Sequence, residues 1–162
     1  MIVVSDASPL IALMKAGQLE LLEKLYGNVI IPQAVFDELT INNKYPAEAE
    51  LITGSTFITV VKIKDSKSVR LFQQVTGLDL GESEAIKYAA DNNADLVLID
   101  ELSGRLAAKK MELNCIGSLG VLIMAYKKKH INANAVKAAV EQMKSSNIYF
   151  DDKLTDSVLK EL

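Results

Sequence analysis

Hydrophobic residues along the chain form short continuous runs, which are separated by longer amphipathic segments. Five of these runs are rich in β-branched residues and do not alternate with polar ones, as is typical of strands buried on both faces of a sheet. They lie at residues 2–5, 29–31, 57–63, 96–99 and 115–116. Because these runs alternate with helical segments, the pattern predicts an α/β fold with an open, mostly parallel sheet and helices on both faces.

The segments between the runs carry helical periodicity and recognisable helix starts. Ser8 followed by Pro9 indicates an N-cap and a first helical residue, and Pro32 is expected to open the next helix in the same way. Further helices are expected at residues 47–51, 68–75, 82–92, 102–111, 119–128, 133–143 and 153–160. Residues 41–46 are the most loop-like interior segment. No repeat or long linker divides the 162 residues, so we expect a single domain spanning 1–162.

Two aspartates directly follow predicted strands. Asp6 comes after the first strand and Asp100 after the fourth, in the stretches VVSDASPL and LVLID. The carboxyl ends of parallel strands meet at one edge of a sheet, where ligands bind in folds of this class. The alternative is that each aspartate caps the helix that follows it. Capping is plausible for Asp100, but it is less so for Asp6, because Ser8 is already available for that role.

Helix geometry brings two glutamates towards the same edge. In the stretch GESEAIKYAADNN, Glu82 falls near the middle of the apolar stripe, whereas Glu84 points to the opposite side. The alternative for Glu82 is a capping box with Asp79, three residues earlier. In PQAVFDEL, Glu38 lies on the flank of the buried face. Both helices therefore turn one acidic residue towards the protein.

Four carboxylates can accordingly meet at one edge of the sheet: those of Asp6, Glu38, Glu82 and Asp100. Two unit charges ~4 Å apart repel by about 4 kcal/mol at an effective dielectric constant of ~20. Such a cluster must raise its pKa values or bind a cation. Oxygen ligands without paired histidine or cysteine favour Mg²⁺ or Mn²⁺. Divalent ions held by carboxylates activate water for the hydrolysis of phosphodiesters.

Five stretches, in this order, carry a resemblance to a known family: VVSDASPLIAL, VIIPQAVFDEL, LDLGESEAIKYA, ADLVLIDELSGR and IGSLGVLIMA. The chain resembles the PIN-domain family of metal-dependent ribonucleases, and within it the prokaryotic subgroup that opens with VVSD, then Ala or Thr, then SPL. The first acid of the family is matched by Asp6 and its helix glutamate by Glu38. The third acid of the family, commonly Asp, is matched by Glu82, and the fourth by Asp100.

Four further residues are candidates for secondary roles near these acids. By resemblance, Ser8 matches a small hydroxyl residue of the family and Arg105 a basic residue that often follows the fourth acid. From its position, Glu101 either ligates a metal through water or adds negative charge to a helix first turn. Ser118 follows the last strand and is either close to the site or a helix N-cap.

The resemblance also implies an architecture and an activity. We expect a three-layer sandwich with a five-stranded parallel sheet of order 3-2-1-4-5. The expected activity is Mg²⁺- or Mn²⁺-dependent cleavage of single-stranded RNA, often in the role of a toxin opposed by an antitoxin protein. One alternative is a PIN fold that only binds nucleic acid or protein. The other is a receiver-like signalling module, but this class requires an acidic pair after the first strand and a lysine after the last.

Composition adds limits on compartment and assembly. The net charge of −3 gives no electrostatic footprint of a dedicated nucleic-acid binder. A lone cysteine, Cys115, favours a reducing compartment. We see no signal peptide, and the longest apolar run, 119–126, is shorter than the ~20 residues of a membrane span. A cytoplasmic protein without membrane contact is therefore expected. The same run exceeds one amphipathic face, so we expect part of it in a homodimer interface.

Overall fold

The five strands form one parallel sheet in the order β3-β2-β1-β4-β5, which confirms the predicted fold class and strand order. The computed structural model describes residues 1–41 and 44–162. The strands are β1 (Val3–Ser5), β2 (Val29–Pro32), β3 (Ile58–Val61), β4 (Leu96–Leu98) and β5 (Cys115–Ile116). In the centre of the sheet, β1 pairs with β4 in a register that sets Ser5 opposite Leu98.

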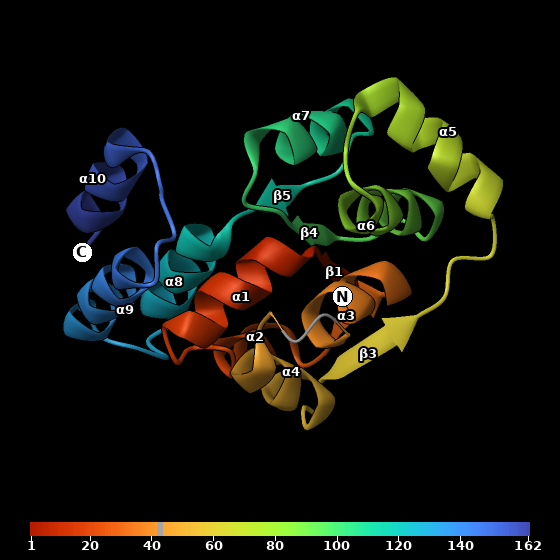
Figure 1. Ribbon diagram of the computed structural model, residues 1–162. Helices are drawn as coiled ribbons and strands as arrows, with labels where there is room; N and C mark the ends of the chain where they lie inside the picture. The colour runs from red at the N-terminus through yellow and green to blue at the C-terminus, as the bar shows by residue number, and fades with distance from the viewer. Residues whose placement is uncertain (42–43) are drawn as a thin grey trace.

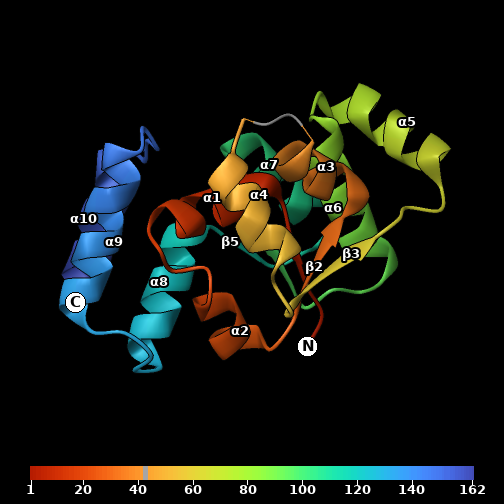
Figure 2. The ribbon, with the colours of Figure 1, turned by 60° about the horizontal axis from the view of Figure 1, so that its bottom comes forward.

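Helices connect the strands and cover both faces of the sheet (Figure 1). In the described residues they are α1 (Ala7–Lys15), α2 (Leu21–Tyr26), α3 (Gln33–Thr40), α4 (Pro46–Thr53), α5 (Ser66–Thr76), α6 (Leu80–Asp91), α7 (Leu102–Lys110), α8 (Ser118–Lys127), α9 (Ala133–Ser145) and α10 (Asp152–Lys160). Helices α5, α6 and α7 lie on one side of the sheet, and α1, α2, α8 and α9 on the other. Helices α9 and α10 both pack against α8 and lie at the outer end of the molecule beyond it (Figure 1 and Figure 2).

Each face of the sheet has its own hydrophobic core. Val3 of β1 packs in the core with α1, α8 and α9, whereas its neighbour Val4 packs in the core with α6. Successive residues of a strand point to opposite faces, so this short central strand contributes to both cores. Burying both sides of β1 fixes the position at which the strand ends.

The structure corrects several of the predicted element positions. Strand β3 is shorter than predicted and is not buried on both faces, because it is the edge strand of the sheet. Helix α2 was not predicted, since its six residues are too few to show a clear period. Of the loop-like segment 41–46, residues 42–43 lie outside the described residues, and α4 already begins at Pro46.

Two helix starts also differ from the prediction. Helix α1 begins at Ala7, so Asp6 occupies the N-cap position and Ser8 lies inside the first turn. Pro9 is tolerated there because the first N–H groups of a helix have no intrahelical partner. Pro32 ends β2 and precedes α3 with an extended ψ of 159°, so it closes the strand instead of occupying the first helical position.

The apolar run at residues 119–126 is covered largely within the chain. Helix α8 contacts α1, α2, α9 and α10, and Leu119, Val121, Leu122 and Ala125 are buried. The excess of apolar residues is therefore explained without a second copy, and the homodimer remains an untested prediction. None of the helices in the described residues has the length and apolar character to cross a membrane.

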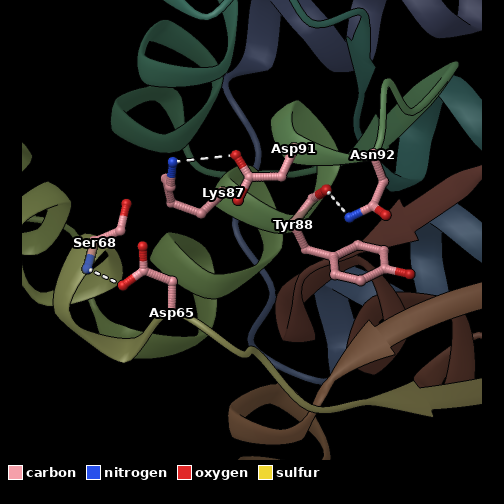
Figure 3. Close-up of polar contacts among 6 residues, drawn as sticks. All are labelled: Asp65, Ser68, Lys87, Tyr88, Asp91 and Asn92. Atoms are coloured by element: carbon pink, nitrogen blue, oxygen red, sulfur yellow. Dashed lines mark hydrogen bonds and ion pairs between the residues drawn. The ribbon is translucent and has the colours of Figure 1, made fainter.

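The far end of α6 and the start of α5 carry local polar contacts (Figure 3). The Asp65 side chain caps α5 by accepting a hydrogen bond from the Ser68 N–H at 3.0 Å. On α6, the Lys87 ammonium lies 3.3 Å from Oδ1 of Asp91, one helical turn away. Each of these two carboxylates has a partner on its own helix.

Candidate active site

Asp6 and Asp100 lie at the carboxyl ends of two neighbouring central strands. The N–H of Asp6 donates to the carbonyl of Leu98 at 3.0 Å, so pairing between β1 and β4 continues to the residue that carries the carboxylate. The Asp6 side chain is buried, with 3% of its surface exposed. In the described residues no side-chain capping bond forms at the start of α1, so Asp6 occupies the N-cap position but its carboxylate does not cap the helix.

The Asp100 carboxylate is held by Ser118, the first residue of α8. The Ser118 N–H donates to Oδ1 of Asp100 at 2.7 Å, and the Ser118 hydroxyl lies 3.1 and 3.0 Å from Oδ1 and Oδ2. A Cβ on Gly117 would overlap Oδ1 of Asp100, so only glycine leaves room for this arrangement. Burial raises the pKa of Asp100, while the Ser118 hydrogen bonds and the charge of Arg105 oppose that rise.

Glu82 points inward and also takes part in the capping box. Its N–H donates to Oδ1 of Asp79 at 2.8 Å, and the Asp79 N–H lies 3.4 Å from Oε2 of Glu82. The other oxygen, Oε1, is buried and has no hydrogen-bond donor among the described residues. A Cβ on Gly104 of α7 would lie 3.0 Å from this oxygen. Glu82 can therefore belong to the capping box and also be a metal ligand, since the box uses Oε2 and leaves Oε1 for a metal.

The electrostatics of Asp6 and Glu82 reflect burial among like charges. Burial raises the pKa of Asp6 to about 8; the Ala7 N–H opposes this rise, while the charges of Glu82, Asp79 and Glu38 add to it. Burial raises the pKa of Glu82 to about 7, and the nearby charges of Asp79 and Glu101 add to that rise. In the described part of the chain, no ion pair with lysine or arginine compensates either carboxylate.

Glu38 approaches the same place from α3. Much of its side chain is exposed, yet a Cβ on Gly81 would lie 3.3 Å from Oε2 of Glu38 and 3.6 Å from Oδ1 of Asp6. The two carboxylates therefore face one glycine in the first turn of α6. Burial of its inner end and the charge of Asp79 raise the pKa of Glu38, and Lys44 opposes that rise.

The four candidate acids thus form two groups. Asp6, Glu38 and Glu82 surround the start of α6, whereas Asp100 is held by Ser118 at the start of α8. Within residues 1–41 and 44–162, no three acidic, histidine or cysteine side chains are spaced to share one metal ion in the positions they adopt. The donor set still fits a hard divalent cation, because every donor is an oxygen and Oε1 of Glu82 is buried with no partner in the part of the chain that the structure describes.

Two further acids act on this cluster. Asp79, which sequence reasoning treated only as a cap, raises the pKa values of Asp6, Glu38 and Glu82 through its charge. Glu101 lies beside Glu82, and its charge also acts on Glu38 and Asp100. The sequence already contained a signal for Asp79. It was predicted to share a capping box with Glu82, so its side chain had to lie at the same edge of the sheet as Glu82.

The secondary candidates have different outcomes. Ser118 contacts Asp100, but the N-cap of α8 is Gly117, so the capping alternative for Ser118 was wrong. Arg105 lies close enough for its charge to act on Asp100. Ser8 is half-buried in α1, and in the described residues it makes no side-chain hydrogen bond to a site carboxylate. Glu84 does not simply face solvent, because its Oε2 accepts a hydrogen bond from the Ala34 N–H at 3.0 Å.

Comparison with known families agrees with this geometry. The family model DUF3368, described as a PIN domain, matches residues 2–162. The chain belongs to the PIN-domain family. No curated protein and no solved structure matches it. PIN domains are generally nucleases and typically use divalent metal ions. The observed strand order also excludes the receiver-like alternative, since that fold has the order 2-1-3-4-5.

Proposed function

We propose that this PIN domain is an endoribonuclease that cleaves single-stranded RNA with Mg²⁺ or Mn²⁺. The observation that carries the proposal is Oε1 of Glu82, which is buried without a hydrogen-bond partner among the described residues and lies close to the equally buried Asp6. An unsatisfied buried polar group costs about 1–3 kcal/mol, and more if it is charged. A cation bound between these groups would remove that cost, which supports a metal-binding role over a purely structural one.

The proposed roles combine the family resemblance with the position of each carboxylate. Asp6 and Glu82 would hold the cation, Asp100 would approach it from the start of α8 to complete the ligand set, and Glu38 would act as a further ligand or position a water molecule. Ser118 would keep the Asp100 carboxylate oriented, as groups that hydrogen-bond to metal ligands commonly do. When bound, a divalent cation supplies positive charge at the phosphate and lowers the pKa of water.

The biological setting belongs to the same proposal. The resemblance to the VVSD subgroup supports a toxin role in the cytoplasm, with an antitoxin protein as partner. Induced expression of the wild-type chain should then arrest growth, while the Glu82→Gln variant at equal abundance should not. Equal growth of the two cultures would contradict the toxin role without affecting the cleavage chemistry.

The decisive experiment is a cleavage assay on single-stranded and duplex RNA with Mn²⁺, with Mg²⁺ and with EDTA. We expect cleavage of the single strand that requires the metal. Glu82→Gln should reduce the rate at least ~100-fold, since losing a ligand costs more than the 10–100-fold typical of outer-shell changes.

Glu84→Gln on the same helix is the matched control. Glutamine keeps an oxygen to accept the Ala34 N–H, so this variant should cleave at close to the wild-type rate. RNA binding without cleavage under all three conditions would favour the alternative of an inert binding module. Equal losses in the two variants would show that the distinction between the two glutamates is wrong.

A further inference from the structure

A groove extends from Asp100 along the C-terminal segment. Two adjoining cavities of about 280 and 520 Å³ lie between α7, α8 and α10. They share five lining residues: Asp100, Arg105, Phe150, Leu154 and Ser157. Because Asp100 is common to both cavities, the groove opens directly onto the candidate active site. Its outer wall is formed by α10, which packs against α8.

The groove combines an aromatic side chain with cations. Tyr149 lines it and is 86% exposed, and Leu102 on the α7 side is 72% exposed. Arg105 and Lys153 also line it, and among the described residues neither forms an ion pair. The groove therefore offers a flat apolar surface beside two available positive charges.

The acidic residues of the groove outside the active site are engaged locally. The side chain of Asp151 accepts the Lys153 N–H at 2.8 Å and caps α10. Glu161 forms an ion pair with Lys127, at 2.9 Å. With the Lys127–Glu161 pair set aside, the charged residues of the groove outside the active site are Arg105 and Lys153 against Asp151, which leaves a small excess of positive charge and favours an anionic partner.

Exposed aromatics next to a basic track are the features by which proteins bind single-stranded nucleic acid, with bases stacked on rings and phosphates held by cations. We propose that this groove is a subsite for the RNA strand that continues beyond the cleaved phosphate. Tyr149 stacks on a nucleobase, and Arg105 and Lys153 contact backbone phosphates. This inference rests on the proposed ribonuclease function and adds a binding site that the cleavage chemistry itself does not require.

The test compares a dinucleotide, too short to extend from the cleaved phosphate to Tyr149, with a single strand of about twelve nucleotides. The wild type should show a lower KM for the long strand. Tyr149→Ala should raise that KM roughly fivefold or more, within the range expected for loss of one stacked base. It should leave kcat/KM for the dinucleotide unchanged. Tyr149→Phe keeps the ring and should behave as the wild type.

Matched controls lie outside the groove. Leu71→Ala removes another exposed apolar side chain, on α5, and should leave the KM unchanged. Lys153→Ala should reduce the salt dependence of binding, whereas Lys110→Ala, an equal change of charge at the end of α7, should reduce it less. Tyr149 is highly exposed, so its variants should show the wild-type circular dichroism spectrum and melting temperature.

A binding measurement separates failure of this inference from failure of the proposed function. Fluorescence anisotropy of the long strand in EDTA reports binding without cleavage. Binding that Tyr149→Ala weakens, without any metal-dependent cleavage by the wild type, would support the groove and refute the ribonuclease. Cleavage with an unchanged length preference in Tyr149→Ala would overturn the groove alone, as would a loss that Tyr149→Phe does not restore. A groove that binds a peptide instead predicts unchanged RNA kinetics in every variant.

Discussion

The acidic residues at the two ends of α6 have opposite environments. At the C-terminal end, Asp91 is 58% exposed in its side chain and lies 3.3 Å from the Lys87 ammonium (Figure 3). At the N-terminal end, Glu82 is 3% exposed and one of its oxygens has no donor in the described residues. The same helix thus carries a compensated carboxylate at one end and an uncompensated one at the other.

The difference lies in where the two ends of the helix meet the sheet. An exposed pair one helical turn apart contributes only about 0.3–0.5 kcal/mol, so the Lys87–Asp91 contact is nearly neutral for stability. The opposite end faces the carboxyl ends of β1 and β4, where Asp6 is also buried. Burying several carboxylates together destabilises a fold unless protons or a cation neutralise them. The N-terminal end of α6 is therefore the part of the helix at which the proposed cation would relieve an unfavourable burial of charge.

The largest expected effect is the difference in metal-dependent cleavage between Asp6→Asn and Asp91→Asn. Asp6→Asn should reduce metal-dependent cleavage at least ~100-fold. In EDTA near neutral pH it should melt at or above the wild-type temperature, because asparagine does not carry the free-energy cost of protonating this buried carboxyl on folding. Added Mn²⁺ should stabilise the wild type as RT ln(1 + [L]/Kd) and this variant much less.

Asp91→Asn provides the other half of that comparison. It should cleave RNA normally, and its unfolding free energy should change by less than ~0.5 kcal/mol with or without metal. Thermal melts by circular dichroism, run with EDTA and with Mn²⁺, measure both variants. A melting shift in Asp6→Asn that does not depend on the metal would indicate a capping role for Asp6 instead.

The second expected effect is a pH dependence of the metal-free protein. The pKa values of Asp6 and Glu82 are about 8 and about 7 in the folded state, above the ordinary values of 3.8 and 4.5. Between these limits the folded state binds more protons than the unfolded state, so stability falls as the pH rises from about 5 to 8. The slope is at most ~1.4 kcal/mol per pH unit for each proton.

Urea unfolding in EDTA at several pH values measures this slope. Asp6→Asn should flatten it, since one of the two titrating groups is removed, whereas Asp91→Asn should leave it unchanged. Stability that rises between pH 5 and 8 in EDTA would contradict the burial of protonated carboxyls at this end of α6.

A third effect concerns the glycine that accommodates Asp100. Gly117→Ala places a methyl group where Oδ1 of Asp100 lies, so the carboxylate must move away from the Ser118 N–H. Loss of hydrogen bonds to a charged group should cost about 1.5–3 kcal/mol in the metal-free protein and weaken Mn²⁺ binding. Gly54→Ala, at an exposed position after α4, should cost less than ~1 kcal/mol by the same urea measurement.

The smallest expected effect is that of Lys87→Ala. Removing the partner of Asp91 should change the unfolding free energy by about 0.3–0.5 kcal/mol, and the change should shrink further in high salt. Cleavage should be unaffected. A loss above ~1.5 kcal/mol in the same urea titration would mean that the two ends of α6 are less different than described.

Periodicity and strand alternation predicted the parts of this fold that depend on local pattern. The strand segments, the positions of Asp6 and Asp100 at strand ends, and the inward orientation of Glu82 follow from rules that act within one element, and the alternation of strands and helices predicted a parallel sheet. The order of its strands came from the family resemblance. The N-cap prediction for Ser8 failed because capping residues identify a helix start only to within a residue or two.

Contacts between elements could not be predicted in the same way. The helical wheel placed Glu84 opposite the core of its own helix, but the N-terminus of α3 lies there and Glu84 accepts its Ala34 N–H. For the same reason, the flank position of Glu38 did not reveal that much of its side chain is exposed while its carboxylate reaches Gly81. The helical period of hydrophobic residues shows which way a side chain points around the axis of its own helix. The contacts of Glu84 and Glu38 depend instead on where the neighbouring helix lies.

The hydrogen bond from the Asp6 N–H to the Leu98 carbonyl determines how slowly the Asp6 amide hydrogen exchanges with solvent. It belongs to the two central strands, which are flanked on both sides and packed on both faces. Amide hydrogens in such strands exchange with solvent only when the whole molecule unfolds, whereas those at exposed helix ends exchange through local fraying. The Asp6 amide should therefore be among the last to take up deuterium, so the backbone that carries the first carboxylate would keep its position for the lifetime of the native state.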